Sequence, residues 1–87
     1  MQYIIAVFKN RTECYSFLSI MKSYTNSAHI INTPKEINMP CGISVAFKLN
    51  NFNDAKYILS RRHFSSFSGF YKILQTSTTL RILPAYF

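Results

Sequence analysis

The stretch "QYIIAVFKNRTECYSFLSIM" (residues 2–21) decides the fold class of this chain of 87 residues. Most residues of its first part are β-branched, aromatic or small and apolar, which predicts a buried strand over 2–8. Asn10, followed three positions later by Glu13, fits a capping box at the start of a helix. The helix then shows an apolar stripe at the expected spacing, made of Cys14, Phe17, Leu18 and Met21. We therefore expect a strand followed by a helix whose apolar face packs into the core.

The rest of the chain also consists of predicted strands and a further predicted helix. Its patterns predict strands over 28–33, 42–48 and 70–75, and a second helix over 50–63. The order β-α-β-β-α-β is that of an α+β, ferredoxin-like two-layer sandwich, with one antiparallel sheet and two helices on one face. We assign residues 1–77 to this domain. Residues 78–87 are a C-terminal tail that adds an edge strand, covers the sheet or meets a second subunit.

Composition limits the classes of function. Ten Lys and Arg residues against three acidic residues give a net charge of +7, which favours anionic partners such as RNA, an acidic protein or a small anion. A basic domain without any nucleic-acid role is an equal alternative. No apolar run approaches the ~18 residues of a membrane span, so we expect no membrane contact. Two cysteines without an export signal predict the cytoplasm, with reduced thiols. Because the cysteines and histidines lack metal-ligand spacing, we expect no metal and no cofactor.

The second cysteine lies in an unusual place, in the segment "TPKEINMPCGIS" (residues 33–44) between two strands. The strand order puts this loop where the first strand ends and the first helix begins, near Arg11. The turn after the second helix, with His63, comes to the same end. Cations and a helix amino terminus favour the reactive thiolate form of a cysteine. The alternative is that Cys41 fills a pocket at the start of the third strand.

This segment resembles the signature of the small bacterial sulfur/selenium carrier-like domains. Their pattern is a strand ending in Thr-Pro, a basic residue and Glu, a short variable stretch, then Cys-Gly and an apolar strand. The positions that match are Thr33, Pro34, Lys35, Glu36, Cys41 and Gly42. The order of elements also agrees up to about residue 77. Departures are Lys35 where arginine is common, Asn38 where serine is common, and Pro40 directly before the cysteine.

The resemblance implies a carrier rather than an enzyme. Cys41 would hold sulfur or selenium as a persulfide or its selenium equivalent, between a donor enzyme such as a cysteine desulfurase and an acceptor protein. The residues that would support it are Pro34, Lys35, Glu36, Gly42, Arg11 and His63. Lysine lacks the bidentate fork of arginine, so Lys35 would recognise an oxyanion less tightly.

Two other functions fit the same order of elements. RRM-like RNA-binding domains share it, but they stack bases on aromatic side chains of the central strands. Here the face of the third strand that points away from the helices carries Ser44, Ala46 and Lys48. The other alternative is a non-catalytic interaction module that forms a homodimer through the apolar tail residues Leu80, Ile82, Leu83, Tyr86 and Phe87.

Overall fold

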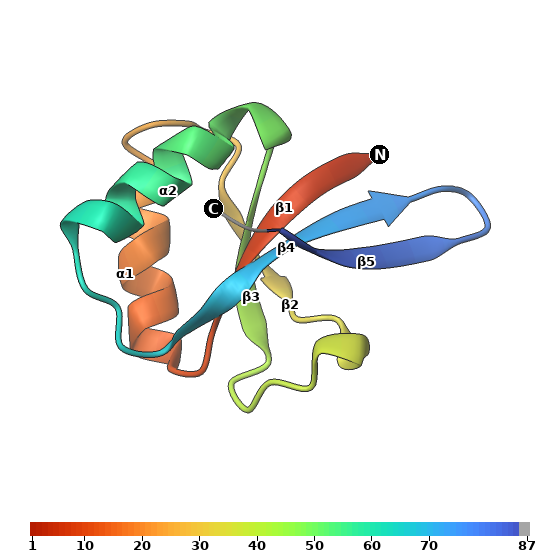
Figure 1. Cartoon of the computed structure of the whole chain (residues 1–87), viewed down its shortest axis with the longest axis horizontal. Coiled ribbons are helices and arrows are strands. Elements are labelled where there is room, and N and C mark those ends of the chain that lie inside the picture. Colours follow the sequence, from red (N-terminus) through yellow and green to blue (C-terminus); the bar gives the residue numbers. More distant parts are fainter. Residues whose placement is uncertain (86–87) are drawn as a thin grey trace.

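The computed structural model describes residues 1–85, which form one five-stranded antiparallel sheet and two α-helices (Figure 1). In chain order the elements are β1 (Gln2–Phe8), α1 (Arg11–Met21), β2 (His29–Asn32), the short 3₁₀ helix η1 (Lys35–Ile37), β3 (Ile43–Phe47), a second 3₁₀ helix η2 (Leu49–Asn51), α2 (Phe52–Arg61), β4 (Phe67–Gln75) and β5 (Leu80–Ala85). The strands lie side by side in the order β2-β3-β1-β4-β5. The α+β two-layer sandwich predicted from the sequence is confirmed.

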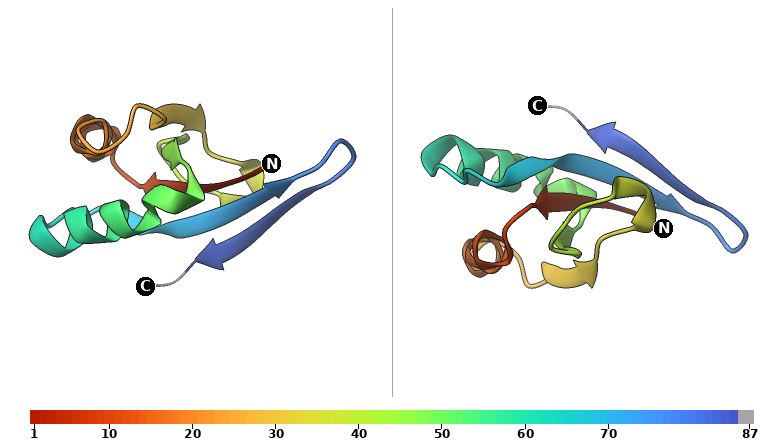
Figure 2. Two further views of the ribbon diagram at one scale, coloured as in Figure 1. Left: turned by 90° about the horizontal axis from the view of Figure 1, so that it is seen from above. Right: turned by 90° about the horizontal axis from the view of Figure 1, so that it is seen from below.

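Of the roles left open for the C-terminal tail, the structure shows the edge strand, which is added to the predicted order of elements as β5. Residues 80–85 pair antiparallel with β4, and a turn in which the Thr76 amide donates to the Thr79 carbonyl at 2.9 Å joins the two strands. Pro84 is tolerated because β5 is an edge strand. The β4–β5 hairpin extends away from the helices (Figure 2). Tyr86 and Phe87, which we assigned to the apolar tail, lie outside the described residues.

The main core lies between the sheet and the two helices. Alternate residues of β1 face this layer, and the stripe predicted on α1 faces it from the other side. Its fully buried members include Ile4, Ala6, Phe8, Cys14, Phe17, Met21, Val45 and Phe47. The Phe8 ring contacts three further rings, those of Phe17, Phe64 and Phe67, at centroid distances of 5.3, 5.7 and 5.4 Å. Burial of this aromatic cluster is a major source of stability in so small a domain.

The opposite face of the sheet is also packed, contrary to the open face expected from the sequence. Ser44 and Ala46, which we placed on that open face, are both buried. A second cluster covers this face, formed by Ile5, Val7, Ile37, Ala46 and Ile73 with Met39 and Ile82 packed against it. Figure 1 shows η1, which carries Ile37, on the side of the sheet opposite α1 and α2. The loop from β2 to β3 therefore folds back beneath the sheet.

The start of α1 is tied to the turn before β4. Asn10 caps the helix as predicted, because its side-chain oxygen accepts from the Glu13 amide at 3.1 Å. The reciprocal half of the predicted capping box is wrong. The Glu13 carboxylate instead accepts from the Ser66 amide at 2.7 Å and the Ser65 amide at 3.2 Å, and from both hydroxyls. These hydrogen bonds, led by that from the Ser66 hydroxyl, lower the pKa of Glu13.

Because the pKa of Glu13 is lowered in the folded chain, we expect the free energy of unfolding to fall at acid pH. The pKa of Glu13 is lower in the folded chain than its ordinary 4.5, so its contribution is present above that pH and is lost as the pH falls below it. Replacing Glu13 by glutamine should lower the free energy of unfolding by about 1 kcal/mol at neutral pH, since the group is solvent-accessible. Urea titrations at several pH values should give a smaller acid-induced loss for this variant. An unchanged loss, matching that of an exposed Glu36→Gln control, would contradict this role.

Candidate functional site

The segment from Thr33 to Gly42 is held in one conformation by contacts at both of its ends and in its middle. The Thr33 amide donates to the Gly42 carbonyl at 2.8 Å, and the Thr33 and Ser44 hydroxyls lie 2.6 Å apart. In the middle, Ile37 is only 8% exposed and packs into the second cluster. A loop anchored in this way presents its cysteine with little further loss of conformational entropy.

The sulfur of Cys41 points inward at backbone carbonyl groups. The thiol is half-buried and lies 2.8 Å from the carbonyl oxygen of Phe8 and 3.4 Å from that of Ile43. A carbonyl oxygen can only accept, so the sulfur is the donor and carries its proton in this arrangement. The predicted place at the end of the first strand is thus observed. The hydrogen-bond partners of the sulfur are carbonyl oxygens, and the cations predicted at this end of the sheet are not among them.

Gly42 is required by its backbone conformation. Its φ is +72°, in the left-handed region that residues with a side chain rarely adopt. A Cβ built at this position would meet no atom within 4 Å, so crowding is not the reason for the glycine. The same open space lies directly beside the residue that bears the thiol, and it leaves room for a partner to approach the Cys41 segment.

The two cysteines of the chain are neighbours in the fold. Cys14 is fully buried on the inner face of α1, as the helical stripe predicted, and Cys41 packs against the same core. Burial, together with the nearby Cys41 thiol and against a smaller opposing effect of Arg11, raises the pKa of Cys14 from 9.0 to about 11. At neutral pH Cys14 is therefore a protonated, inaccessible thiol and a poor nucleophile.

The raised pKa of Cys14 predicts a loss of stability in alkali. The protonated form is favoured in the folded chain, so this contribution is fully present below about pH 9 and is lost as the pH rises towards about 11. A Cys14→Ala variant should lose less stability over this interval than the natural chain, because it has no thiol to ionise. Free energies of unfolding measured between about pH 8 and pH 11 test this. If the free energies of unfolding of the two proteins fell equally with pH, the raised pKa of Cys14 would be contradicted.

The remaining residues of the predicted motif surround η1. Pro34 immediately precedes this short helix, and Lys35 and Glu36 form its first two positions with both side chains exposed. Their shared role in the structure is to turn the chain so that Ile37 reaches the second cluster. The structure does not bring Lys35 to the sulfur as a hydrogen-bond partner, since those partners are Phe8 and Ile43.

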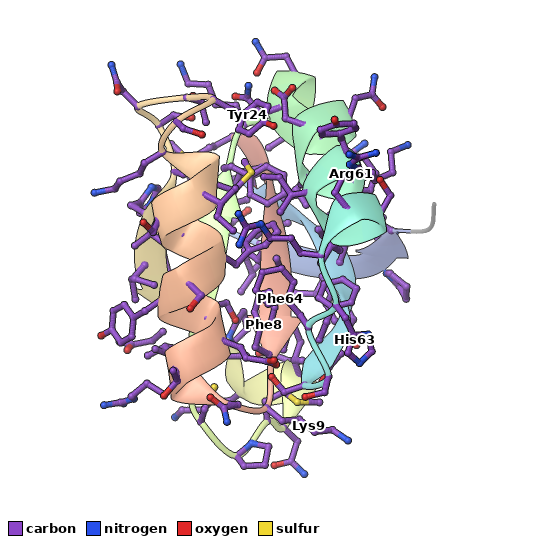
Figure 3. All side chains as sticks on the ribbon, turned by 90° about the vertical axis from the view of Figure 1, so that its left-hand side faces the viewer. Phe8, Lys9, Tyr24, Arg61, His63 and Phe64 are labelled. Atoms are coloured by element: carbon purple, nitrogen blue, oxygen red, sulfur yellow. The ribbon has the colours of Figure 1, made fainter. Side chains whose placement is uncertain are left out.

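Arg11 and His63, the two supporting residues predicted outside the Cys41 segment, are both exposed. Arg11 is the first residue of α1, and its charge acts on Cys14. Figure 3 shows Lys9 below Phe8, towards the bottom of the view, and His63 to the right of Phe8. Arg61, in the last turn of α2, lies over the ring of Tyr57, with 5.9 Å between the guanidinium carbon and the ring centroid.

His63 lines a shallow pocket of about 300 Å³ beside the aromatic cluster. Its other lining residues are Lys56, Leu59, Ser60, Arg62, Phe64 and Phe67. Phe64 and Phe67 also contact the Phe8 ring, so one layer of aromatic side chains separates this basic pocket from the residue whose carbonyl binds Cys41. Within residues 1–85, no three His, Cys, Asp or Glu side chains gather in a way that could hold a metal ion.

Sequence reasoning missed the carbonyl oxygens of Phe8 and Ile43 as the groups that hold the thiol. Residue types carry no signal for such backbone contacts. It also missed Ile37 and Met39 as anchors of the loop, although both are apolar residues in an otherwise polar segment, which was a usable signal.

Comparison with known families gives one match to this chain. The model of the family described as "Putative Se/S carrier protein-like" matches residues 3–72, which span β1 through most of β4 and include Cys41. The chain belongs to this Se/S carrier protein-like family. Neither the curated proteins nor the solved structures gave a match. No helix formed by the described part of the chain has the length and apolar character needed to cross a membrane.

Proposed function

We propose that the chain carries sulfur or selenium on Cys41, receiving the atom from a donor enzyme and passing it to an acceptor protein in the cytoplasm. The observation that supports this most strongly is the combination of family membership with an anchored, half-buried thiol beside open space at Gly42. The second thiol, Cys14, is unsuited to the role because it is buried and protonated.

The proposed step is a transfer of one sulfur atom between thiols. The Cys41 thiolate attacks the outer sulfur of a donor persulfide, R–S–SH, and the S–S bond of the donor breaks. The products are Cys41–S–SH and the donor thiolate, so charge and atoms balance without an external oxidant. Before the attack the proton of Cys41 passes to a base of the donor or to water. Relay to an acceptor repeats the step with the acceptor thiolate as nucleophile.

The hydrogen bond to the Phe8 carbonyl gives the resting carrier a protected thiol. With its S–H directed at that oxygen, the half-buried thiol has its proton turned into the protein. It must rotate away from the carbonyl before it can react. We infer that docking of the donor at the Cys41 segment favours this rotation, which restricts loading to the proper partner.

A basic surface at the same end suits docking of an acidic donor. Lys56, Arg62 and His63 line one pocket there, with the apolar rings of Phe64 and Phe67 between them and Phe8. Two of the three acidic residues of the chain are engaged by neutral donors, since Glu13 binds Ser65 and Ser66 and Asp54 accepts from Asn51 at 3.0 Å. Positive charge of this kind raises the association rate with acidic partners.

Removing charge from this surface should weaken docking without changing the thiol. For the variant Arg62→Gln we expect loading by a cysteine desulfurase to slow by about threefold to tenfold at low donor concentration, and to recover at saturating donor. The matched control is Lys22→Gln, an exposed cation after the carboxyl end of α1. Initial loading rates measured at two salt concentrations check this. Equal rates for both variants would rule out docking through Arg62.

Donors of sulfur and of selenium, each incubated with the chain, test which of the two elements Cys41 carries. Incubation with a cysteine desulfurase and cysteine should add about 32 Da, one sulfur atom, to the intact chain, and treatment with a reducing thiol should remove it. A parallel reaction with a selenocysteine lyase and selenocysteine should add about 79 Da if selenium is carried. Failure of several such donors to give either adduct would overturn the proposal.

A further inference from the structure

A well-formed pocket lies at the opposite end of the sheet from Cys41. It has a volume of about 650 Å³ and is bordered by the first residues of β1, the start of β2 and the segment after β3. Its lining includes Tyr3, whereas Cys41 is bonded to Phe8, five residues further along the same strand. At about 3.3 Å per residue, roughly 16 Å separates the two features. The proposed carrier chemistry therefore does not use this pocket.

The pocket opens on the face of the sheet that points away from the helices. Ile31 and Tyr3 belong to that face, because both pack against the second cluster. His29 shares it, since it is paired with Ala46, a member of the same cluster. Residues Ile5 and Val7 on this face are fully covered, while Tyr3 and Ile31 keep part of their surface accessible. The cover supplied by the β2–β3 loop is thus incomplete towards the Tyr3 end.

The walls of the pocket are mainly apolar and its charged groups are basic. Tyr3, Ile31 and Leu49 supply apolar surface, and Leu49 is 38% exposed. Lys48 stands at the rim, directly after β3. No acidic residue is found among the described residues that line the pocket. A volume of this size, apolar with a few polar groups, is typical of a small-molecule site.

His29 is a second polar residue of the pocket, and one of its ring nitrogens is held by a hydrogen bond. Its Nδ1 lies 2.8 Å from the carbonyl oxygen of Ser27, and because that oxygen can only accept, Nδ1 carries the proton. The other ring nitrogen, Nε2, is then the one available to a ligand. His29 is the first residue of β2 and Lys48 directly follows the neighbouring strand β3, and both residues line the same pocket.

We propose that this pocket binds a small amphipathic anion, an aromatic or aliphatic acid whose apolar body lies against Tyr3, Ile31 and Leu49 and whose acid group is bound by Lys48. The apolar walls provide most of the binding energy, and the lysine selects for negative charge. The carrier site and this pocket are separate, so a ligand here is a further activity of the chain and not its cargo.

The test uses a pair of dyes that differ only in the acid group, anilinonaphthalenesulfonate and its uncharged counterpart phenylnaphthylamine. Fluorescence titration of the full chain should give saturable binding at one site, with the sulfonate bound about tenfold more tightly. Lys48→Gln should remove this tenfold preference and leave the uncharged dye unaffected. Leu49→Ser should weaken both dyes by about threefold to tenfold.

Control variants separate the pocket from general basicity and from the carrier site. Lys9→Gln changes an exposed cation at the other end of β1, and Cys41→Ser changes the proposed carrier residue, so both should bind the dyes as the natural chain does. Circular dichroism establishes that each variant is folded. Binding without saturation, an equal affinity for the two dyes, or a Lys48→Gln variant that keeps the preference for the sulfonate would overturn the proposal.

Discussion

Replacing Cys41 by serine should reduce loading with sulfur to background, a loss of about a hundredfold or more. A hydroxyl does not displace a thiolate from a persulfide, so the variant retains no group at this position that can accept the atom. Serine is nearly isosteric with cysteine and can donate to the same carbonyl oxygen of Phe8, so we expect the fold to be unchanged. The measurement is the intact mass of the chain after incubation with a cysteine desulfurase and cysteine.

The matched control for this variant is Cys14→Ala. Because Cys14 is buried and its pKa is raised to about 11, removing it should leave the amount of sulfur loaded per chain unchanged. If loading survived in Cys41→Ser but disappeared in Cys14→Ala, the sulfur would be carried by Cys14, and our assignment of Cys41 would be wrong. Loss in both variants would mean that the two thiols act together.

Truncation of Phe8 to alanine should cost about 3–5 kcal/mol of stability, the largest effect that we expect from any single core substitution. Phe8 is fully buried and its ring contacts those of Phe17, Phe64 and Phe67, so the shortened side chain leaves a cavity between α1 and the start of β4. Natural domains are stable by about 5–15 kcal/mol, and one this small lies towards the lower end. Urea denaturation followed by circular dichroism measures the change.

Two further variants keep this prediction testable if Phe8→Ala does not fold. Phe8→Leu retains most of the buried volume and should lose only about 1–1.5 kcal/mol. Tyr15→Ala removes an aromatic side chain of α1 that is 50% exposed, and it should change stability by less than about 0.5 kcal/mol. If Tyr15→Ala destabilised the chain as much as Phe8→Leu, the aromatic cluster would not be the centre of the core.

The sequence was sufficient to predict the elements whose residues alternate with a clear period. α1 was predicted from such a period and β1 from its continuous run of β-branched and apolar residues, and Cys14 was placed in the core by its position in the helical stripe. The order of the strands was enough to put the Cys41 segment at the end of β1, where its thiol contacts the Phe8 carbonyl. These predictions succeeded because local pattern and tertiary packing agree in these segments.

Other features depend on contacts that no local pattern encodes. The partners of Glu13, Ser65 and Ser66, are more than fifty residues away in the sequence. Residues 80–85 were left open between a tail and an edge strand because the sequence shows no partner for them, and their pairing with β4 makes them β5. Ile37 packs under the sheet from a single 3₁₀ turn, which is too short to show a period.

The position of the transferred atom tests the central proposal most directly. Loading with cysteine that carries a heavy isotope of sulfur, followed by alkylation, proteolysis and tandem mass spectrometry, identifies the residue that holds the added sulfur. We predict that the label is found as a persulfide on the peptide containing Cys41 and that it leaves this peptide when an acceptor thiol is added. Label on the Cys14 peptide, or label that is never bound to the chain, would contradict the account.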